Sequence, residues 1–148
     1  MDAIDSAIID QLRRDARVSN NELAERVGLT PSPCLRRVRR LEEEGVILGY
    51  HARINPDAID QGFEVWIELE LADMKQATVE RFEAALVAFD EIIEARRMFG
   101  SPDYEALVRV ADRTAYEAFM TQQLTALPGL ARMQSRFPMK TIKAPHEG

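Results

Sequence analysis

The sequence predicts an α+β protein in two parts: a helical first part, and a longer second part in which strands alternate with helices. Up to Gly45 the apolar residues recur at helical spacing. From Phe63 onward the apolar period switches between two and about 3.6 residues. The residues between these patterns favour turns. We therefore expect one domain over residues 1–53, a linker over residues 54–62 and a second domain over residues 63–148.

The first two helices are indicated by spacing and by capping residues. Ile4, Ile8 and Leu12 predict an amphipathic helix over about residues 4–16. Ser19 followed by Glu22 forms a capping-box pattern that opens a second helix. Gly28 is expected to end that helix, because glycine adopts a left-handed C-cap without steric cost.

A third helix is expected from Thr30 to Gly45. Thr30 serves as N-cap, and Pro31 occupies the first helical position, where its missing N–H does no harm. Two helices joined by a short turn that begins with glycine form the helix-turn-helix layout.

Four arginines fall within five consecutive positions of this third helix. At about 100° per residue, three of them share one face with two smaller residues, and Arg37 lies on the flank. That outer face holds Ser32, Pro33, Arg36, Arg39 and Arg40. The opposite, inward face holds Cys34, Leu35, Val38 and Leu41. Such a helix would pack its apolar stripe on the first two helices and present guanidinium groups to phosphates and guanine edges of DNA. A merely solvated helix face is the alternative, disfavoured by the place of this helix in the helix-turn-helix.

Charge distribution supports a nucleic-acid partner despite the net charge of −6. Residues 1–55 hold nine basic and nine acidic residues, so the excess of acid belongs to the second part. A local basic patch still attracts phosphate, because salt screens distant charges beyond about 10 Å. An acidic start without the layout of a signal peptide and the lack of a long apolar run predict a cytoplasmic protein with no membrane partner. As a DNA-binding protein it is expected to be nucleoid-associated.

After Gly45, apolar and polar residues alternate over residues 46–55 and suggest a strand and a hairpin or wing, with His51 and Arg53 beside the DNA backbone. A metal role for His51 is disfavoured, since the only other histidine is His146 and zinc needs clustered ligands. Cys34 is the only cysteine; we expect it to be buried by packing rather than to sense redox state. No metal and no cofactor are predicted.

The second part is expected to form a ferredoxin-like βαββαβ sandwich. Alternation predicts a first strand from Phe63 to Leu71, and helical spacing continues from Val79 to Phe89. The remaining elements are strands over residues 91–99 and 104–111, a helix from Tyr116 ended by Pro128-Gly129, and a last strand over about residues 130–143. Pro138 conflicts with that last strand and indicates an edge, a bulge or an earlier end.

This order gives a four-stranded antiparallel sheet with both helices on one face. The other face has no helices. A domain of this size would have to cover it, and pairing with a second copy is the simplest way.

The motifs together resemble the Lrp/AsnC family of bacterial and archaeal transcription regulators, over essentially the whole chain. In the first part the resemblance is carried by Ile4-Asp5 and Leu12 with Asp15-Ala16-Arg17, Ser19-Asn20 with Glu22-Leu23-Ala24, Val27-Gly28-Leu29-Thr30, Pro33 to Glu42, and Gly45-Val46-Ile47 with Gly49-Tyr50. In the second part it is carried by Gly100 with Asp103-Tyr104, then Tyr116 and Leu127-Pro128-Gly129.

The resemblance implies a DNA-binding regulator that dimerises through the sandwich and assembles further to a tetramer or octamer, with an amino acid or similar metabolite bound between sandwich domains. The expected contacts to double-stranded DNA are Ser19, Asn20, Ser32, Pro33, Arg36, Arg37, Arg39, Arg40 and Arg53. The expected effector contacts are Gly100, Ser101, Pro102, Asp103, Tyr104, Thr114, Arg136 and Phe137. The family's effector loop carries an acidic residue where this chain has Ser101, which leaves open a different ligand, a shifted contact or no ligand.

Three alternatives remain at this point. An enzyme is disfavoured, because the sequence has no phosphate-binding glycine loop, no nucleophile with a nearby base and no metal constellation. An architectural DNA-binding protein without an effector is the main alternative, and Ser101 is the feature that favours it. A ligand-binding module with a vestigial helix-turn-helix is disfavoured by the arginines on the exposed face.

Overall fold

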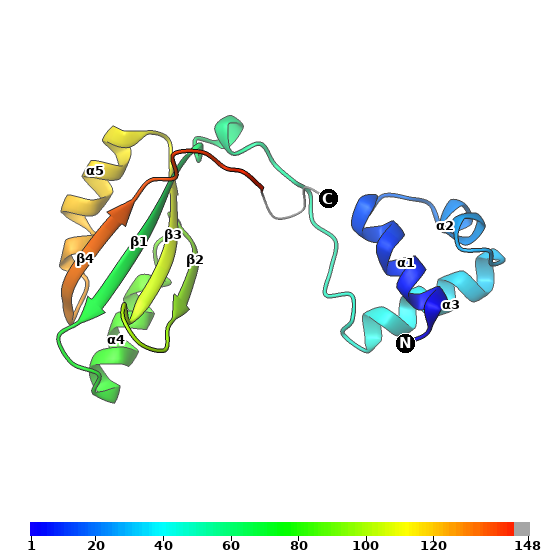
Figure 1. The fold of residues 1–148 in the computed structure, drawn as a ribbon, viewed down its shortest axis with the longest axis horizontal. Helices are drawn as coiled ribbons and strands as arrows, with labels where there is room; N and C mark the ends of the chain where they lie inside the picture. The colour runs from blue at the N-terminus through cyan, green and yellow to red at the C-terminus, as the bar shows by residue number, and fades with distance from the viewer. Residues whose placement is uncertain (144–148) are drawn as a thin grey trace. The chain divides into compact units, whose positions relative to one another are not determined.

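A computed structural model describes residues 1–143, which fold as two compact units. The first unit holds residues 1–53 and the second holds residues 54–142. Figure 1 shows the helices and strands of each unit. Each unit has its own hydrophobic core.

The first unit consists of three helices whose ends follow the capping residues. They are α1 (Ala3–Arg14), α2 (Asn20–Arg26) and α3 (Pro31–Glu43). Ser19 caps α2 by accepting the backbone N–H of Glu22, and Thr30 is the N-cap of α3 without a side-chain hydrogen bond. Gly28 follows α2 with a φ of 70°, the left-handed conformation expected of it. The core is formed by Ile8, Leu23, Ala24, Cys34 and Leu41.

Two expectations for this unit are wrong. Residues 46–55 form no strand. Leu48 and Ile54 are 92% and 55% exposed, and only Ile47 of this segment packs on the helical core, so a ribbon here would have no face to bury. Leu35, expected on the inward face, is 39% exposed. At about 300° from Ser32 it lies at the edge of the apolar stripe, next to the outer face.

The second unit has the expected βαββαβ order, with two added 3₁₀ turns. Its elements are η1 (Pro56–Ile59), β1 (Phe63–Leu71), α4 (Gln76–Leu86), β2 (Ile92–Arg97), β3 (Tyr104–Val110), α5 (Arg113–Gln122), η2 (Leu124–Ala126) and β4 (Leu130–Arg136). The sheet order is β2-β3-β1-β4, and all three pairings are antiparallel.

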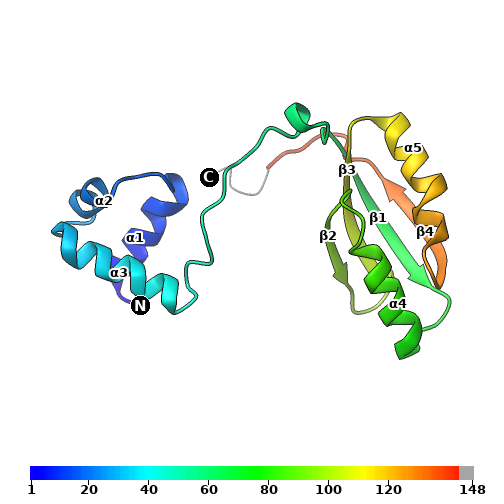
Figure 2. The same cartoon turned by 180° about the vertical axis from the view of Figure 1, so that it is seen from behind.

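Helices α4 and α5 cover one face of this sheet (Figure 2). Alternate residues of β1, Val65, Ile67 and Leu69, point into the core between sheet and helices and are fully buried. The intervening residues, Trp66, Glu68 and Glu70, therefore lie on the helix-free face.

Several elements of the second unit end earlier than expected: β2 at Arg97, α4 at Leu86, and most clearly β4 and α5. β4 stops at Arg136, two residues before Pro138, because proline cannot donate to the strand ladder. Helix α5 ends at Gln122, and the apolar residues that follow continue as the 3₁₀ turn η2. Gly129 then turns the chain with a φ of 77°, close enough to α4 that an added Cβ would lie 2.5 Å from Cγ2 of Thr78.

The helix-free face, which was expected to need a cover, is mostly charged. Arginines on the neighbouring strands pair with the glutamates of β1 in three ion pairs: Glu64 with Arg109, Glu68 with Arg136 and Glu70 with Arg132. Trp66 stands among them and is 38% exposed. Burial of bare apolar surface therefore does not by itself require a partner on this face.

Candidate DNA-binding and ligand-binding sites

The four arginines of α3 divide into two pairs. Arg36 and Arg39 are exposed and form no ion pair with any residue that the structure describes. Arg37 and Arg40 instead contact α1: Nη1 of Arg37 lies 2.8 Å from Oδ1 of Asp5, and Nη2 of Arg40 lies 2.7 Å from Oδ2 of the same carboxylate. Arg37 therefore lies on the flank, as expected. Arg40 differs from the expectation that placed it on the outer face with Arg36, because its guanidinium turns toward α1.

Asp5 is the centre of this arrangement and is only 1% exposed. It forms a reciprocal capping box with Asp2, in which each carboxylate accepts the other residue's backbone N–H at 2.9 Å. The N–H of Asp2 contributes most to lowering the pKa of Asp5 to about 2, and Arg37 and Arg40 lower it further against the effect of burial. Asp5 therefore stays ionised and holds two guanidinium groups at once.

The other residues expected at the DNA lie around the start of α3. Ser32 is exposed and Pro33 is half-buried in its first turn, and Arg53 is exposed beyond its end. Asn20 has a structural contact: its Nδ2 donates to the carbonyl of Pro31 at 2.9 Å and so ties the start of α2 to the start of α3. Ser19 uses its hydroxyl as the cap of α2.

The loop between β2 and β3 contains Gly100 to Asp103 and is held by its own side chains. Oδ2 of Asp103 accepts the backbone N–H of Leu71 at 2.8 Å, which fastens the loop to the end of β1. The Ser101 hydroxyl donates to Oε1 of Glu70 at 3.1 Å. Gly100 has a φ of 107°, a conformation that favours glycine. Asp103 therefore has a structural contact that sequence reasoning did not foresee.

Tyr104 follows this loop, but its side chain lies on the helix side of the sheet and is 2% exposed. Its ring centroid lies 4.8 Å from that of Phe82, and its hydroxyl donates to Glu83 at 2.8 Å. Burial, followed by the Glu83 carboxylate, raises the pKa of Tyr104 to about 12. The side chain is thus a core residue, turned away from the helix-free face.

Beside the loop, the helix-free face is hollowed into a pocket of about 250 Å³ with strongly polar walls. It is lined by Glu68, Glu70, Ser101, Pro102, Arg132 and Gln134. Oε1 of Glu70 accepts from Nη2 of Arg132 at 2.7 Å, and this contact, followed by that of Ser101, lowers the pKa of Glu70. The pocket therefore offers carboxylates, a guanidinium and an amide within one small space.

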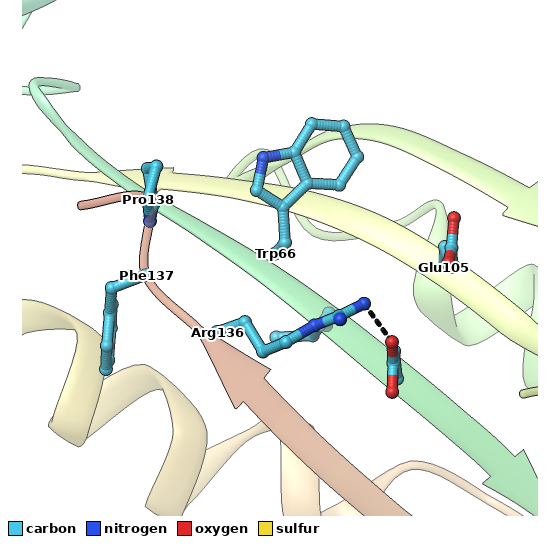
Figure 3. Close-up of a pocket in the computed structure, with 7 residues that line it drawn as sticks. Trp66, Glu105, Arg136, Phe137 and Pro138 are labelled. Carbon is cyan, nitrogen blue, oxygen red and sulfur yellow. Dashed lines mark hydrogen bonds and ion pairs between the residues drawn. The ribbon is translucent and has the colours of Figure 1, made fainter. Parts of the chain in front are cut away.

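Figure 3 shows a second pocket, of about 200 Å³. Glu68 lines both this pocket and the first one. Arg136 projects into it and pairs with Glu68, while Trp66 and Glu105 form other parts of the wall. Phe137 points away from the indole, and its ring packs against Phe63 and Tyr116 at centroid distances of 5.4 and 5.8 Å.

Thr114 is brought to neither pocket. It is exposed in the first turn of α5 and lies outside the residues that line these two cavities.

Comparison with known proteins identifies both units. Residues 1–47 match the winged helix-turn-helix DNA-binding family, and residues 64–147 match the Lrp/AsnC ligand-binding domain. The chain belongs to the Lrp/AsnC family. The leucine-responsive regulatory protein of Haemophilus influenzae is 40% identical to it over 143 residues, which cover 97% of this chain and 86% of that protein.

Solved structures of Lrp/AsnC regulators have the same fold. A transcriptional regulator of Neisseria meningitidis, solved with L-methionine, superposes with a TM-score of 0.91 at 32% identity, covering 97% of this chain and 93% of that one. An AsnC family transcriptional regulator from Agrobacterium tumefaciens superposes with a TM-score of 0.90 at 32% identity, covering 97% and 94%.

The fold class and the family expected from the sequence are therefore confirmed. As an Lrp/AsnC protein, the chain is a DNA-binding transcriptional regulator with an N-terminal winged helix-turn-helix and a ligand-binding domain behind it. The relatives are transcription regulators, which agrees with the expectation of a non-enzyme. Within residues 1–143 no helix is long and apolar enough to cross a membrane.

Sequence reasoning missed the residues that give the two sites their charge arrangement. Glu68, Glu70 and Arg132 line the polar pocket, and the polar alternation of β1 is the signal that could have placed its glutamates on the helix-free face. Asp5 entered the sequence analysis only as part of the family motif, and its ion pairs with Arg37 and Arg40 were missed. Its position between Ile4 and Ile8 on an amphipathic helix could have marked it as an acid near the core.

Proposed function

We propose that this regulator binds specific duplex DNA through α3, and that an amino acid in the pocket beside the β2–β3 loop changes that binding. The observation that carries the ligand proposal is the juxtaposition of Glu70 and Arg132, two opposite charges 2.7 Å apart in one polar pocket. A free α-amino acid carries the same two charges on neighbouring atoms. The related Neisseria meningitidis regulator was solved with L-methionine, which is an amino acid of this kind.

Each group of the zwitterion has a complementary partner in the pocket. The ligand's ammonium would be held by Glu70, with Glu68 next to it, and its carboxylate would be held by Arg132. The absence of an acidic residue at position 101 is offset in this arrangement. The Ser101 hydroxyl donates to Glu70 and orients the carboxylate that a loop aspartate would otherwise supply.

The proposed ligand replaces an existing ion pair. Its affinity therefore depends on how much more favourable its contacts with Glu70 and Arg132 are than the contact of these two residues with each other. Exposed ion pairs contribute only about 0–1 kcal/mol, and Arg132 is 73% exposed, so the protein loses little when the Glu70–Arg132 pair opens around a ligand. Closure of the pocket by a second protein surface would exclude water and strengthen both new contacts.

A second copy of the chain fits that role, and we propose a homodimer that covers the helix-free face and assembles further to a tetramer or octamer. Glutamates and arginines alternate on this face around the half-exposed Trp66. In a two-fold interface the same patch meets itself, so a surface with both charges can pair with its own copy. Such a dimer would also present two α3 helices to successive turns of DNA.

The experiment that tests the proposed function measures DNA binding by fluorescence anisotropy, with DNA from upstream of the protein's own gene, with and without a pool of common amino acids. We expect specific binding that shifts with the pool. Glu70→Gln and Arg132→Gln should lose the shift while retaining binding. Arg113→Gln, which removes an exposed arginine of α5 outside both pockets, should behave like wild type.

Two other outcomes would contradict parts of the proposal. Specific binding that is indifferent to every amino acid would favour the architectural DNA-binding alternative. A shift that survives both pocket substitutions would place the ligand elsewhere. Light scattering of the same samples tests the dimer, and a monomeric mass at all concentrations would exclude it.

A further inference from the structure

The cluster that joins α1 to α3 has a consequence for how this regulator contacts DNA. Asp5 is a buried charged residue, and its carboxylate contacts arginines of α3 instead of a ligand pocket. Each of its two carboxylate oxygens accepts from a different arginine of the recognition helix. We infer that Asp5 is a positioning residue that withholds Arg37 and Arg40 from DNA, so that Arg36 and Arg39 supply the contacts of this helix.

The charges of the cluster support this division. Arg37 also donates to Asp2 at 2.7 Å, and Nε of Arg40 lies 3.7 Å from Glu44. Three carboxylates therefore surround two guanidinium groups. An arginine whose charge is already neutralised releases no counterion from DNA, because it adds no net positive charge to the surface that meets the phosphates.

The burial of Asp5 makes it unfavourable for Arg37 and Arg40 to leave its carboxylate and contact a DNA phosphate instead. If Arg37 and Arg40 turned to DNA, the Asp5 carboxylate would remain buried with only the N–H of Asp2 as partner. Leaving a buried charge without its partner is costly. The ion pairs also fix the face of α3 that turns toward α1. Arg36 and Arg39, three residues apart on the neighbouring stripe of the helix, are thereby held outward.

Because Arg37 and Arg40 are paired with carboxylates and do not contact phosphates, the affinity for DNA of any sequence is lower than it would be with four free arginines. Phosphate contacts supply essentially all non-specific binding, whereas base contacts distinguish sequences. By limiting the number of free arginines, Asp5 favours recognition of the operator over general attraction to DNA.

The salt dependence of binding to a mixed-sequence duplex tests this inference in the full-length chain. The slope of log K against log salt changes by about 0.9 for each phosphate that the protein neutralises. We expect Arg36→Gln and Arg39→Gln each to reduce the slope by about 0.9 per bound protomer, since each removes one guanidinium group from the DNA surface. Arg40→Gln should leave it unchanged; Asp5 keeps Arg37 and the N–H of Asp2 in that variant, so the fold is retained.

Asp5→Asn supplies the second measurement, because it removes the neutralising charge with little change in size. We expect tighter binding to the mixed-sequence duplex and a slope that is steeper by up to about 0.9, since Arg40 becomes available while Asp2 still holds Arg37 at 2.7 Å. A purely structural role for Asp5 would give equal or weaker binding and no steeper slope. If Arg40→Gln flattens the slope as much as Arg36→Gln does, the inference is overturned, and that result does not depend on whether Asp5→Asn folds.

Discussion

Tyr104→Phe separates a structural from a ligand-binding role for the most conspicuous residue of the β2–β3 loop motif. The substitution removes only the hydroxyl, which donates to Glu83 at 2.8 Å, and keeps the ring that packs on Phe82. A typical hydrogen bond contributes about 0.5–1.5 kcal/mol to stability. Glu83 is half-buried and has Arg97 at 3.9 Å, so it is not left as a buried, unpaired charge. We expect a loss within that range.

Thermal unfolding gives the assay. For a unit of this size, 1 kcal/mol lowers the unfolding midpoint by about 4–8 °C, so the sandwich should melt about 2–12 °C lower. The amino-acid concentration at half-effect in the DNA-binding assay should not change, because the hydroxyl points into the core on the helix side of the sheet. An unchanged midpoint combined with a shifted ligand response would refute this reasoning, since the hydroxyl would then contact the ligand.

The same substitution has a signature at high pH. The folded-state pKa of Tyr104 is raised from 10 to about 12. A group whose folded-state pKa is raised contributes stability that is fully present below the unfolded pKa and is lost as pH rises through the folded pKa. The stability difference between wild type and Tyr104→Phe should therefore be constant below about pH 10 and shrink between about pH 10 and 12. Denaturant titrations of both proteins in that range measure it.

Three further predictions concern the two cores and the Asp5 cluster. Phe82→Ala should destabilise the sandwich by about 3–5 kcal/mol by opening a cavity at a fully buried ring, while proteolysis of the 1–53 unit at low temperature stays unchanged; simultaneous loss of both units would contradict their separate cores. Gly129→Ala should lower the stability of the sandwich by about 1–2 kcal/mol from the left-handed backbone alone. Adding Thr78→Ser, which removes Cγ2, should restore only the stability lost through the 2.5 Å approach to that atom. Full recovery of the urea midpoint would show that backbone strain contributes nothing. The pKa of Asp5 is lowered from 3.8 to about 2, so the stabilisation by its carboxylate is present above about pH 4 and should be lost as pH falls toward 2. The urea midpoint of wild type should therefore approach that of Asp5→Asn in acid. Urea midpoints of the two proteins that change in parallel with pH would show that Asp5 contributes nothing.

The fold could be predicted largely because its signals are local. In β1, buried and outward residues alternate in a register that a single period describes, and the structure keeps the expected bounds of Phe63 and Leu71. Helix α2 begins next to Ser19, whose hydroxyl caps it within one turn of chain, and α3 begins with Pro31 at its first position. In residues 46–55 the same alternation was misleading. Apart from Ile47, these residues have no neighbouring strand or core surface to pack on, and a strand needs such a partner as well as an alternating sequence.

The sites could be predicted only in part, since their geometry depends on side chains from distant segments. A helical wheel located the arginines of α3, but it contained no information about Asp5, which reaches them from 35 residues away in the case of Arg40. Likewise, the resemblance directed attention to the β2–β3 loop itself. The charged walls beside that loop come from β1 and β4, and only the pairing of Glu70 with Arg132 in the sheet brings them together.

Glu68 forms part of the wall between two neighbouring pockets. It lines both of them on the helix-free face and is paired with Arg136, which projects into only one. A molecule that drew this carboxylate toward the β2–β3 loop would leave Arg136 without its partner and make the neighbouring pocket a better receptor for an anion. Thermodynamic linkage makes such an effect reciprocal, so an anion bound beside Trp66 would in turn favour a cation beside Glu70. Two small hollows joined by one side chain would thus respond to a pair of solutes as a single unit, even within one protomer.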